Sequence, residues 1–112
     1  MDEKTTARLR GLLGLARRAG RVEFGFDAVL ESFSKGRAAA AFLARDTAER
    51  TAEHVRAHAG KLPVTELPLS REELGHAIGR GATAAVAVTD AGFARQITEL
   101  AGAAPRTEED HS

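Results

Sequence analysis

Residues 12–37, LLGLARRAGRVEFGFDAVLESFSKGR, decide the expected fold, because they predict a helix, a short strand and a second helix in succession. Leucine and alanine recur at helical spacing up to Gly20, and residues 22–24 form the short strand. Gly25 follows that strand directly and opens the second helix, which ends at residues 35–36. A helix that starts where a strand ends is typical of α/β folds.

Three further apolar runs predict the rest of the sheet. Residues 38–44, AAAAFLA, and residues 83–89, TAAVAVT, are short runs with the character of buried central strands. Alanine-rich runs also favour a helix by propensity. Residues 64–67 lie between Pro63 and Pro68, which suits an edge strand.

Helices are predicted between these strands. Asp46 and Ser70 each precede a glutamate by three residues, as in a capping box, and Asp90 is placed to cap the last helix. Four strands alternating with about five helices predict the α/β class, as a three-layer α/β/α sandwich with a four-stranded mixed sheet. The length of 112 residues suits one domain, which we place at residues 1–101, and residues 102–112 are predicted to be a flexible polar tail.

The composition limits the classes of function. The chain has no cysteine, which excludes a disulfide framework, a thiol nucleophile and a cysteine-ligated metal site. No segment approaches the ~20 apolar residues of a membrane span and the N-terminus lacks a signal-peptide core, so we expect a cytoplasmic protein with no membrane partner. With no Trp or Tyr and five Phe, the chain lacks the exposed aromatic side chains on which many RNA binders stack bases.

Charge is distributed unevenly, although the formal net charge is zero. Residues 5–45 contain eight arginines or lysines and three acidic residues, a local net charge of +5. A helix N-terminus carries unpaired N–H groups and a partial positive charge, so the helix that Gly25 opens can hold a phosphate. Nearby arginines favour a polyanion, and RNA is the polyanion we expect. From charge alone, solvated helix faces explain the pattern about as well.

No catalytic or metal-binding pattern stands out. His54 and His58 are four residues apart on one predicted helix, but no third ligand is evident, so a solvated helix face is favoured over a metal site. Asp46 and Asp90 follow strands as in phosphate-accepting receiver domains, but the acidic pair that such domains need after the first strand is absent. The glycines form neither a P-loop nor a GxGxxG fingerprint. We therefore expect no enzyme activity, no metal and no small-molecule cofactor.

Five segments resemble a known family: LLGLARRAG at residues 12–20, Gly25, SKG at residues 34–36, ELGHAIG at residues 73–79 and TDAGFA at residues 89–94. They are similar to the bacterial YlxQ-type proteins of the ribosomal kink-turn-binding superfamily, the L-seven-Ae, L-thirty-e and Gadd45-like group. The similarity runs from about residue 8 to residue 100. It implies an α/β/α sandwich that binds RNA in a ribosomal or translation-associated setting.

The resemblance also implies where RNA binds. In the family's RNA binders, the N-terminus of the second helix enters a widened groove at sheared G·A pairs, and the loop before the last strand closes over bulged bases. The family pattern Gly-x-Asn-Glu-x-x-Lys falls here on Gly25, Asp27, Ala28 and Glu31, so only its glycine is kept. Asp27 accepts hydrogen bonds but cannot donate them as Asn does, and Glu31 puts an anion where the family has a cation.

We therefore expect structured RNA, kink-turn-like or ribosomal, to bind at the start of the second helix and at the loop before the last strand. The predicted RNA-binding residues are Arg17, Arg18, Arg21, Gly25, Phe26, Asp27, Lys35, Arg37, Arg80, Gly81, Ala82 and Thr83. The ribosome or translation factors are the expected further partners. The alternative is a protein-interaction module on the same fold with reduced RNA binding, which Asp27, Ala28 and Glu31 favour.

Overall fold

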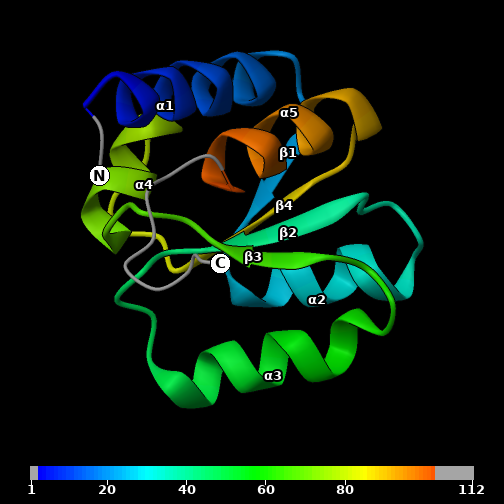
Figure 1. Cartoon of the computed structure of the whole chain (residues 1–112). Helices are drawn as coiled ribbons and strands as arrows, with labels where there is room; N and C mark the ends of the chain where they lie inside the picture. The colour runs from blue at the N-terminus through cyan, green and yellow to red at the C-terminus, as the bar shows by residue number, and fades with distance from the viewer. Residues whose placement is uncertain (1–2, 103–112) are drawn as a thin grey trace, which may run out of the picture.

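The structure, a computed structural model, describes residues 3–102 and contains five helices and four strands over that range (Figure 1). In chain order the elements are α1 (Glu3–Arg18), β1 (Val22–Phe24), α2 (Phe26–Ser34), β2 (Ala40–Leu43), α3 (Glu49–Ala59), β3 (Val64–Glu66), α4 (Arg71–Ala77), β4 (Ala85–Val88) and α5 (Ala91–Gly102). Gly102, where the tail was expected to begin, is the last residue of α5, and the rest of that tail lies outside the described residues. None of these helices is both long enough and apolar enough to cross a membrane.

The four strands form one mixed sheet in the order β1-β4-β2-β3. β4 runs antiparallel to both of its neighbours, and β2 runs parallel to β3. β2 and β4 are the inner strands and all their residues are buried, as predicted for the two alanine-rich runs. β3 is the edge strand expected between Pro63 and Pro68. The predicted α/β class with a four-stranded mixed sheet is confirmed.

Helices cover both faces of this sheet and complete the three predicted layers (Figure 1). α1, α4 and α5 pack on one face, around a core that includes Leu13, Phe42 and Ile97. α2 and α3 pack on the other face, where Val29 and Val55 meet the inner strands. Side chains therefore alternate along β2 between two separate cores, as the period of a strand requires.

The inner strands are shorter than predicted. β2 and β4 have four residues each, and the first residue of each predicted run bonds to another part of the chain instead of to the sheet. The N–H of Ala38 donates to the carbonyl of Ser32 at 3.3 Å, and the N–H of Thr83 donates to the carbonyl of Arg71 at 3.0 Å. Ala38 and Thr83 thus hold turns in place, whereas Ala39 and Ala44 still donate hydrogen bonds to the neighbouring segment of the sheet.

Two predicted helix caps are confirmed. Ser70 caps α4 in a full capping box with Glu73, in which each side chain accepts the other residue's backbone N–H. Asp90 Oδ2 accepts a hydrogen bond of 2.8 Å from the N–H of Phe93 at the start of α5. These two acceptors fix the directions in which α4 and α5 leave the preceding loops.

The cap predicted at Asp46 is wrong. α3 begins after Ala48, which makes no side-chain cap. Asp46 lies two residues earlier, where its Oδ1 accepts the N–H of Arg71 at 2.8 Å and its Oδ2 lies 3.6 Å from the Arg71 Nε. The carboxylate thus joins the turn before α3 to the start of α4, a tertiary contact that the local spacing gave no reason to expect.

Glu73 is a second point at which separate elements meet. Its Oε1 accepts the N–H of Ser70 at 2.8 Å and a hydrogen bond from Arg45 Nη1 at 3.0 Å, while Arg10 Nη2 lies 3.3 Å from its Oε2. The backbone N–H of Ser70, followed by the guanidinium of Arg45, holds the pKa of the Glu73 carboxyl below its ordinary value of 4.5. α1, the loop after β2 and α4 are therefore joined through one carboxylate.

Candidate nucleic-acid interface

The site begins at the edge of the sheet where β1 ends and β4 begins, here called the Gly25 end. Gly25 is the N-cap of α2 with φ 96°, in the left-handed region that favours glycine. Its N–H donates to the carbonyl of Ala85 at 3.3 Å, and its carbonyl accepts the N–H of Val29 at 3.0 Å. No side chain caps α2, so the first turn of the helix offers its N–H groups at this edge. Asp27 lies exposed in that turn.

Phe24, the last residue of β1, gathers two arginines beside Gly25. The guanidinium carbon of Arg17, near the end of α1, lies 4.8 Å from the centre of the Phe24 ring. The guanidinium carbon of Arg80, in the loop before β4, lies 4.4 Å from the same ring centre. Both distances suit cation–π contacts. The structure thus brings together Arg17, Gly25 and Arg80, three residues that the sequence analysis assigned to one site.

Phe24 itself was missed as a member of the site. From the sequence, Phe24 was expected only to end a short strand. A possible signal was its position, an aromatic residue directly before the helix-opening Gly25 in an arginine-rich segment. Its contact with Arg80, however, joins residues 56 positions apart, as the residue numbers show. No local pattern predicts such a contact.

The loop before β4 is tied closely to α4. The N–H of Arg80 donates to the carbonyl of Gly75 at 2.7 Å. Thr83 is buried, and its hydroxyl donates to the carbonyl of Gly81 at 2.8 Å. Ala82 lies exposed between these fixed points. The predicted loop residues therefore share one rigid turn that holds Arg80 beside Phe24.

Gly75 permits this close approach of loop and helix. A Cβ atom at Gly75 would clash with the carbonyl oxygen of Gly81 and would lie 2.6 Å from the carbonyl carbon of Gly81 and 3.1 Å from the carbonyl oxygen of Arg80. All three are backbone atoms, which cannot move aside by a side-chain rotation. Glycine is thus required in the middle of α4, where alanine would otherwise favour the helix.

Arg21, Lys35 and Arg37 are not brought to the Gly25 end. Val22 pairs with Val88 at the other end of β1, which puts the preceding Arg21 there. Lys35 and Arg37 follow the C-terminus of α2, which spans roughly 13 Å at 1.5 Å per residue. These three cations are near Gly25 along the chain, but the fold carries them away from it.

Lys35 and Arg37 also have acidic partners. Lys35 Nζ lies 3.6 Å from Glu31 Oε2. Arg37 donates two hydrogen bonds to Glu23, from Nε at 2.7 Å and from Nη2 at 2.8 Å. The hydrogen bond from Arg37 lowers the pKa of Glu23 below its ordinary value of 4.5. Their charge is thus largely balanced within the chain.

Arg18 follows Arg17 and is the last residue of α1. The two line a shallow groove of about 280 Å³ between the end of α1 and the end of α4, together with Gly14, Ala77 and Gly79. Within residues 3–102, no acidic side chain forms an ion pair with Arg17, Arg18 or Arg80. Of the predicted cations without an acidic partner in this range, Arg17 and Arg80 meet at the Gly25 end, while Arg21 lies at the other end of β1.

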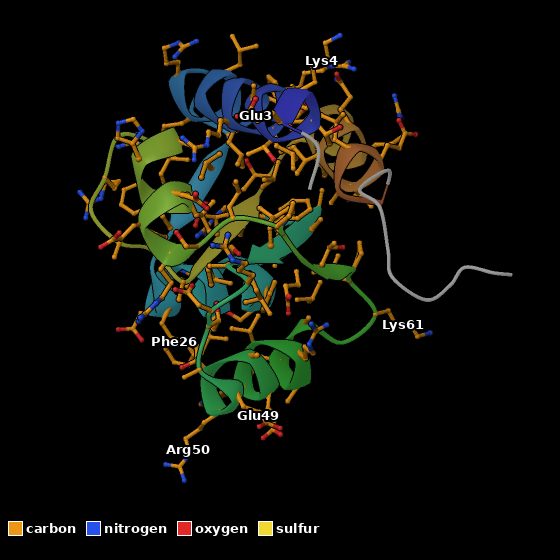
Figure 2. The ribbon with its side chains drawn as sticks, turned by 60° about the vertical axis from the view of Figure 1, so that its left-hand side comes forward. Glu3, Lys4, Phe26, Glu49, Arg50 and Lys61 are labelled. Carbon is orange, nitrogen blue, oxygen red and sulfur yellow. The ribbon has the colours of Figure 1, made fainter. Side chains whose placement is uncertain are left out.

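Phe26, the first residue of α2, turns toward α3 (Figure 2). Its ring meets His54 edge-on with the ring centres 5.0 Å apart, and the His54 and His58 rings lie 4.5 Å apart. Over the described range, no three His, Cys, Asp or Glu side chains lie close enough together to hold a metal ion. Both histidines lie on the exposed surface of α3.

Known proteins share both the sequence pattern and the fold. The family model described as "Ribosomal protein L7Ae/L30e/S12e/Gadd45 family" matches residues 7–98. The chain is 40% identical over 91 residues to the RNA-binding protein YlxQ of Bacillus subtilis (strain 168), a match that covers 80% of this chain and 90% of that protein.

Two solved structures are similar over most of their length. A protein with unknown function from Bacillus halodurans C superposes with a TM-score of 0.81 and 31% identity, over 86% of this chain and 98% of that one. The Giardia lamblia 15.5kD RNA binding protein superposes with a TM-score of 0.70 and 18% identity, over 91% of this chain and 88% of that one. At that identity the second likeness is one of fold alone.

Proposed function

Since the chain belongs to the ribosomal protein L7Ae/L30e/S12e/Gadd45 family, we propose that it is a non-enzymatic RNA-binding protein whose ligand is structured RNA. The Bacillus subtilis relative is named for RNA binding and covers most of the chain. The proposed surface is the Gly25 end: the first turn of α2, the loop of residues 79–84, and the arginines beside them. Cytoplasmic ribosomal RNA is the structured RNA we propose.

One observation carries this proposal. Arg17 and Arg80 stack on Phe24, the residue before the uncapped N-cap Gly25 of α2, and within the described residues neither is in an ion pair. The partial positive charge of the helix end adds to the two guanidinium charges. Phosphate groups complement both features, because backbone N–H groups and guanidinium groups are good donors to phosphate oxygens.

The acidic residues of α2 bear on which RNA is preferred. Asp27 is exposed in the first turn, and Glu31 lies one turn further, paired with Lys35. The family pattern has Asn, Glu and Lys at the positions of Asp27, Ala28 and Glu31, and in the family's RNA binders these side chains contact the kink-turn. We propose that binding here depends on shape and phosphate contacts more than on base reading.

The test is a fluorescence anisotropy titration of a kink-turn RNA and of a scrambled hairpin of equal length, at several salt concentrations. We expect both to bind with an affinity that falls as salt rises, because phosphate contacts release counterions. Equal binding of the two RNAs would exclude the kink-turn preference that the resemblance implies. Absence of salt-dependent binding to either RNA, and to total ribosomal RNA, would overturn RNA binding itself.

A gain-of-function variant sharpens the question of specificity. Asp27→Asn/Ala28→Glu/Glu31→Lys restores the family pattern on this chain. If those side chains limit base reading, affinity for the kink-turn rises at least about fivefold, since one bidentate base contact is worth about 1–3 kcal/mol, while the hairpin gains much less. An equal gain for both RNAs would indicate only the change of charge.

Cellular RNA is the second readout. Ultraviolet crosslinking, recovery of the chain and sequencing of the attached RNA should return ribosomal fragments. A pull-down with and without RNase distinguishes RNA binding from the alternative of a protein-interaction module. A protein partner that stays bound after RNase treatment, together with an absence of crosslinked RNA, would favour the protein-interaction module.

A further inference from the structure

The ring of Phe24 joins three parts of the chain that are distant in sequence. It ends β1, it carries Arg17 from α1, and it carries Arg80 from the loop before β4. Phe24 is half-buried against the core that α1 and α4 share, so packing against this core fixes the position of its ring. With two guanidinium groups over it, this ring is not free to stack on an RNA base.

Arg17 and Arg80 hold two positive charges close together. Both guanidinium carbons lie within 5 Å of one ring centre, so the charges are separated by less than about 10 Å, the Debye length at 0.1 M salt. Within residues 3–102 neither guanidinium has a carboxylate partner. Two like charges repel at this distance, and an anion that contacts both relieves the repulsion.

Both arginines are also held in place before any ligand arrives. The Nε of Arg17 is buried and has no hydrogen-bond partner, because that side chain lies against the ring rather than in solvent. Arg80 sits in the turn that the Gly75 carbonyl and the Gly75–Gly81 contact hold against α4. Side chains ordered in the free protein lose less conformational entropy on binding.

We propose that Phe24 is a positioning residue that holds Arg17 and Arg80 as a preformed clamp for neighbouring backbone phosphates of one RNA strand. The inference rests on the proposed function, since it assigns the ligand group of that same surface. Phe24 touches no RNA; it acts through the two arginines. Because the clamp takes phosphates, its contribution to affinity is independent of base sequence.

A purely structural role for Phe24 predicts a different outcome. Removing the ring would then loosen β1 and Gly25 and would weaken RNA binding whether or not the arginines are present. In the clamp, loss of the ring matters only while both arginines are there to be positioned. A double-mutant cycle separates the two roles.

The experiment measures affinity for the structured RNA across a salt series for five forms of the full chain. These are the unmodified chain, Phe24→Leu, Arg17→Ala/Arg80→Ala, the combination of all three substitutions, and Phe33→Leu as a matched half-buried phenylalanine at the far end of α2. Thermal melts of each form report on folding separately.

We expect Arg17→Ala/Arg80→Ala to reduce the slope of log affinity against log salt by about 1.4–1.8, since each phosphate contact contributes roughly 0.7–0.9. Phe24→Leu should weaken binding about tenfold with little change of slope, from the loss of two cation–π contacts. In the arginine-free background the same change should have almost no effect. An equal loss in both backgrounds, or an equal loss in Phe33→Leu, would overturn the clamp.

A second variant avoids any change to the core. Arg17→Lys/Arg80→Lys keeps both charges, but the ammonium group lacks the planar face that stacks on an aromatic ring. The clamp predicts a several-fold loss of affinity at unchanged slope. Unaltered affinity would contradict the positioning role even if Phe24→Leu does not fold. If the unmodified chain binds no RNA, the proposed function fails before any variant is compared.

Discussion

Replacing Gly75 by alanine tests the contact that holds the loop before β4 against α4. Gly75 lies inside α4, where alanine favours the helix over glycine by about 1 kcal/mol. The new Cβ would clash with the Gly81 carbonyl oxygen and would lie 2.6 Å from its carbonyl carbon. We therefore expect helix propensity to be outweighed by overpacking, and the variant to be less stable.

The expected loss follows from three contributions. Overpacking against backbone atoms lies at the upper end of its range of about 1–3 kcal/mol, because no rotamer change relieves it. Displacement of the loop weakens the 2.7 Å hydrogen bond from Arg80 N–H to Gly75, which is worth about 1 kcal/mol. The higher helix propensity of alanine offsets about 1 kcal/mol of these two losses, so the free energy of unfolding should fall by about 2–3 kcal/mol. For a chain of this length the melting temperature then drops by roughly 10 °C.

Gly11→Ala is the matched control, because Gly11 is an exposed residue of α1 with no atom within 4 Å of the added Cβ. Its melting temperature, followed by circular dichroism at 222 nm, should rise by a few degrees from about 1 kcal/mol of propensity. Urea melts give the same comparison as free energies. A rise in Gly75→Ala of similar size would show that Gly75 and Gly81 are not in close contact. Gly75→Ala should also weaken RNA binding through Arg80, while Gly11→Ala should leave RNA affinity unchanged.

Three further outcomes follow from individual contacts. The backbone N–H of Ser70 and then the guanidinium of Arg45 lower the pKa of Glu73, so its ionised form stabilises the fold above about pH 4.5 and this contribution is lost as the pH falls further. The urea midpoint should therefore decline less steeply from pH 6 to pH 3 in Glu73→Gln than in the unmodified chain, and parallel curves of midpoint against pH would refute this. Asp90→Ala removes the 2.8 Å cap on Phe93 and should lower the free energy of unfolding by about 0.5–2 kcal/mol in urea melts, whereas Asp90→Asn should lose less. Arg37→Gln should leave the salt slope of RNA binding unchanged because Glu23 already balances that charge, whereas Arg80→Gln should reduce it by roughly 0.7–0.9; equal slopes in the two variants would contradict this assignment.

Most of the fold was predictable because its signals are local. The buried runs of β2 and β4, the prolines around β3 and the caps at Ser70 and Asp90 depend on residues within a few positions of one another. The resemblance to the kink-turn-binding family was equally readable, since its motifs are continuous. Asp46 was the exception among the caps, because its carboxylate bonds to an element 25 residues away.

The candidate site was predicted only in part. Nearness along the chain grouped Lys35 and Arg37 with Gly25, although α2 separates them from it and Glu31 and Glu23 balance their charges. Charge counting cannot reveal such pairing, because an ion pair across elements depends on how the helices pack. The local net positive charge was therefore counted correctly, but it did not predict which cations lie at the Gly25 end.

The α/β alternation, the family and the glycine that opens α2 can all be inferred from local patterns, because periodicity, turn residues and motifs act over short distances. Which cations lie at the Gly25 end depends instead on how the elements pack. Arg17 and Arg80 meet there because the sheet ends β1 beside the start of β4 and because Gly75 lets the loop of Gly81 touch α4. That meeting depends on the packing of three elements on one ring, which a one-dimensional pattern does not contain.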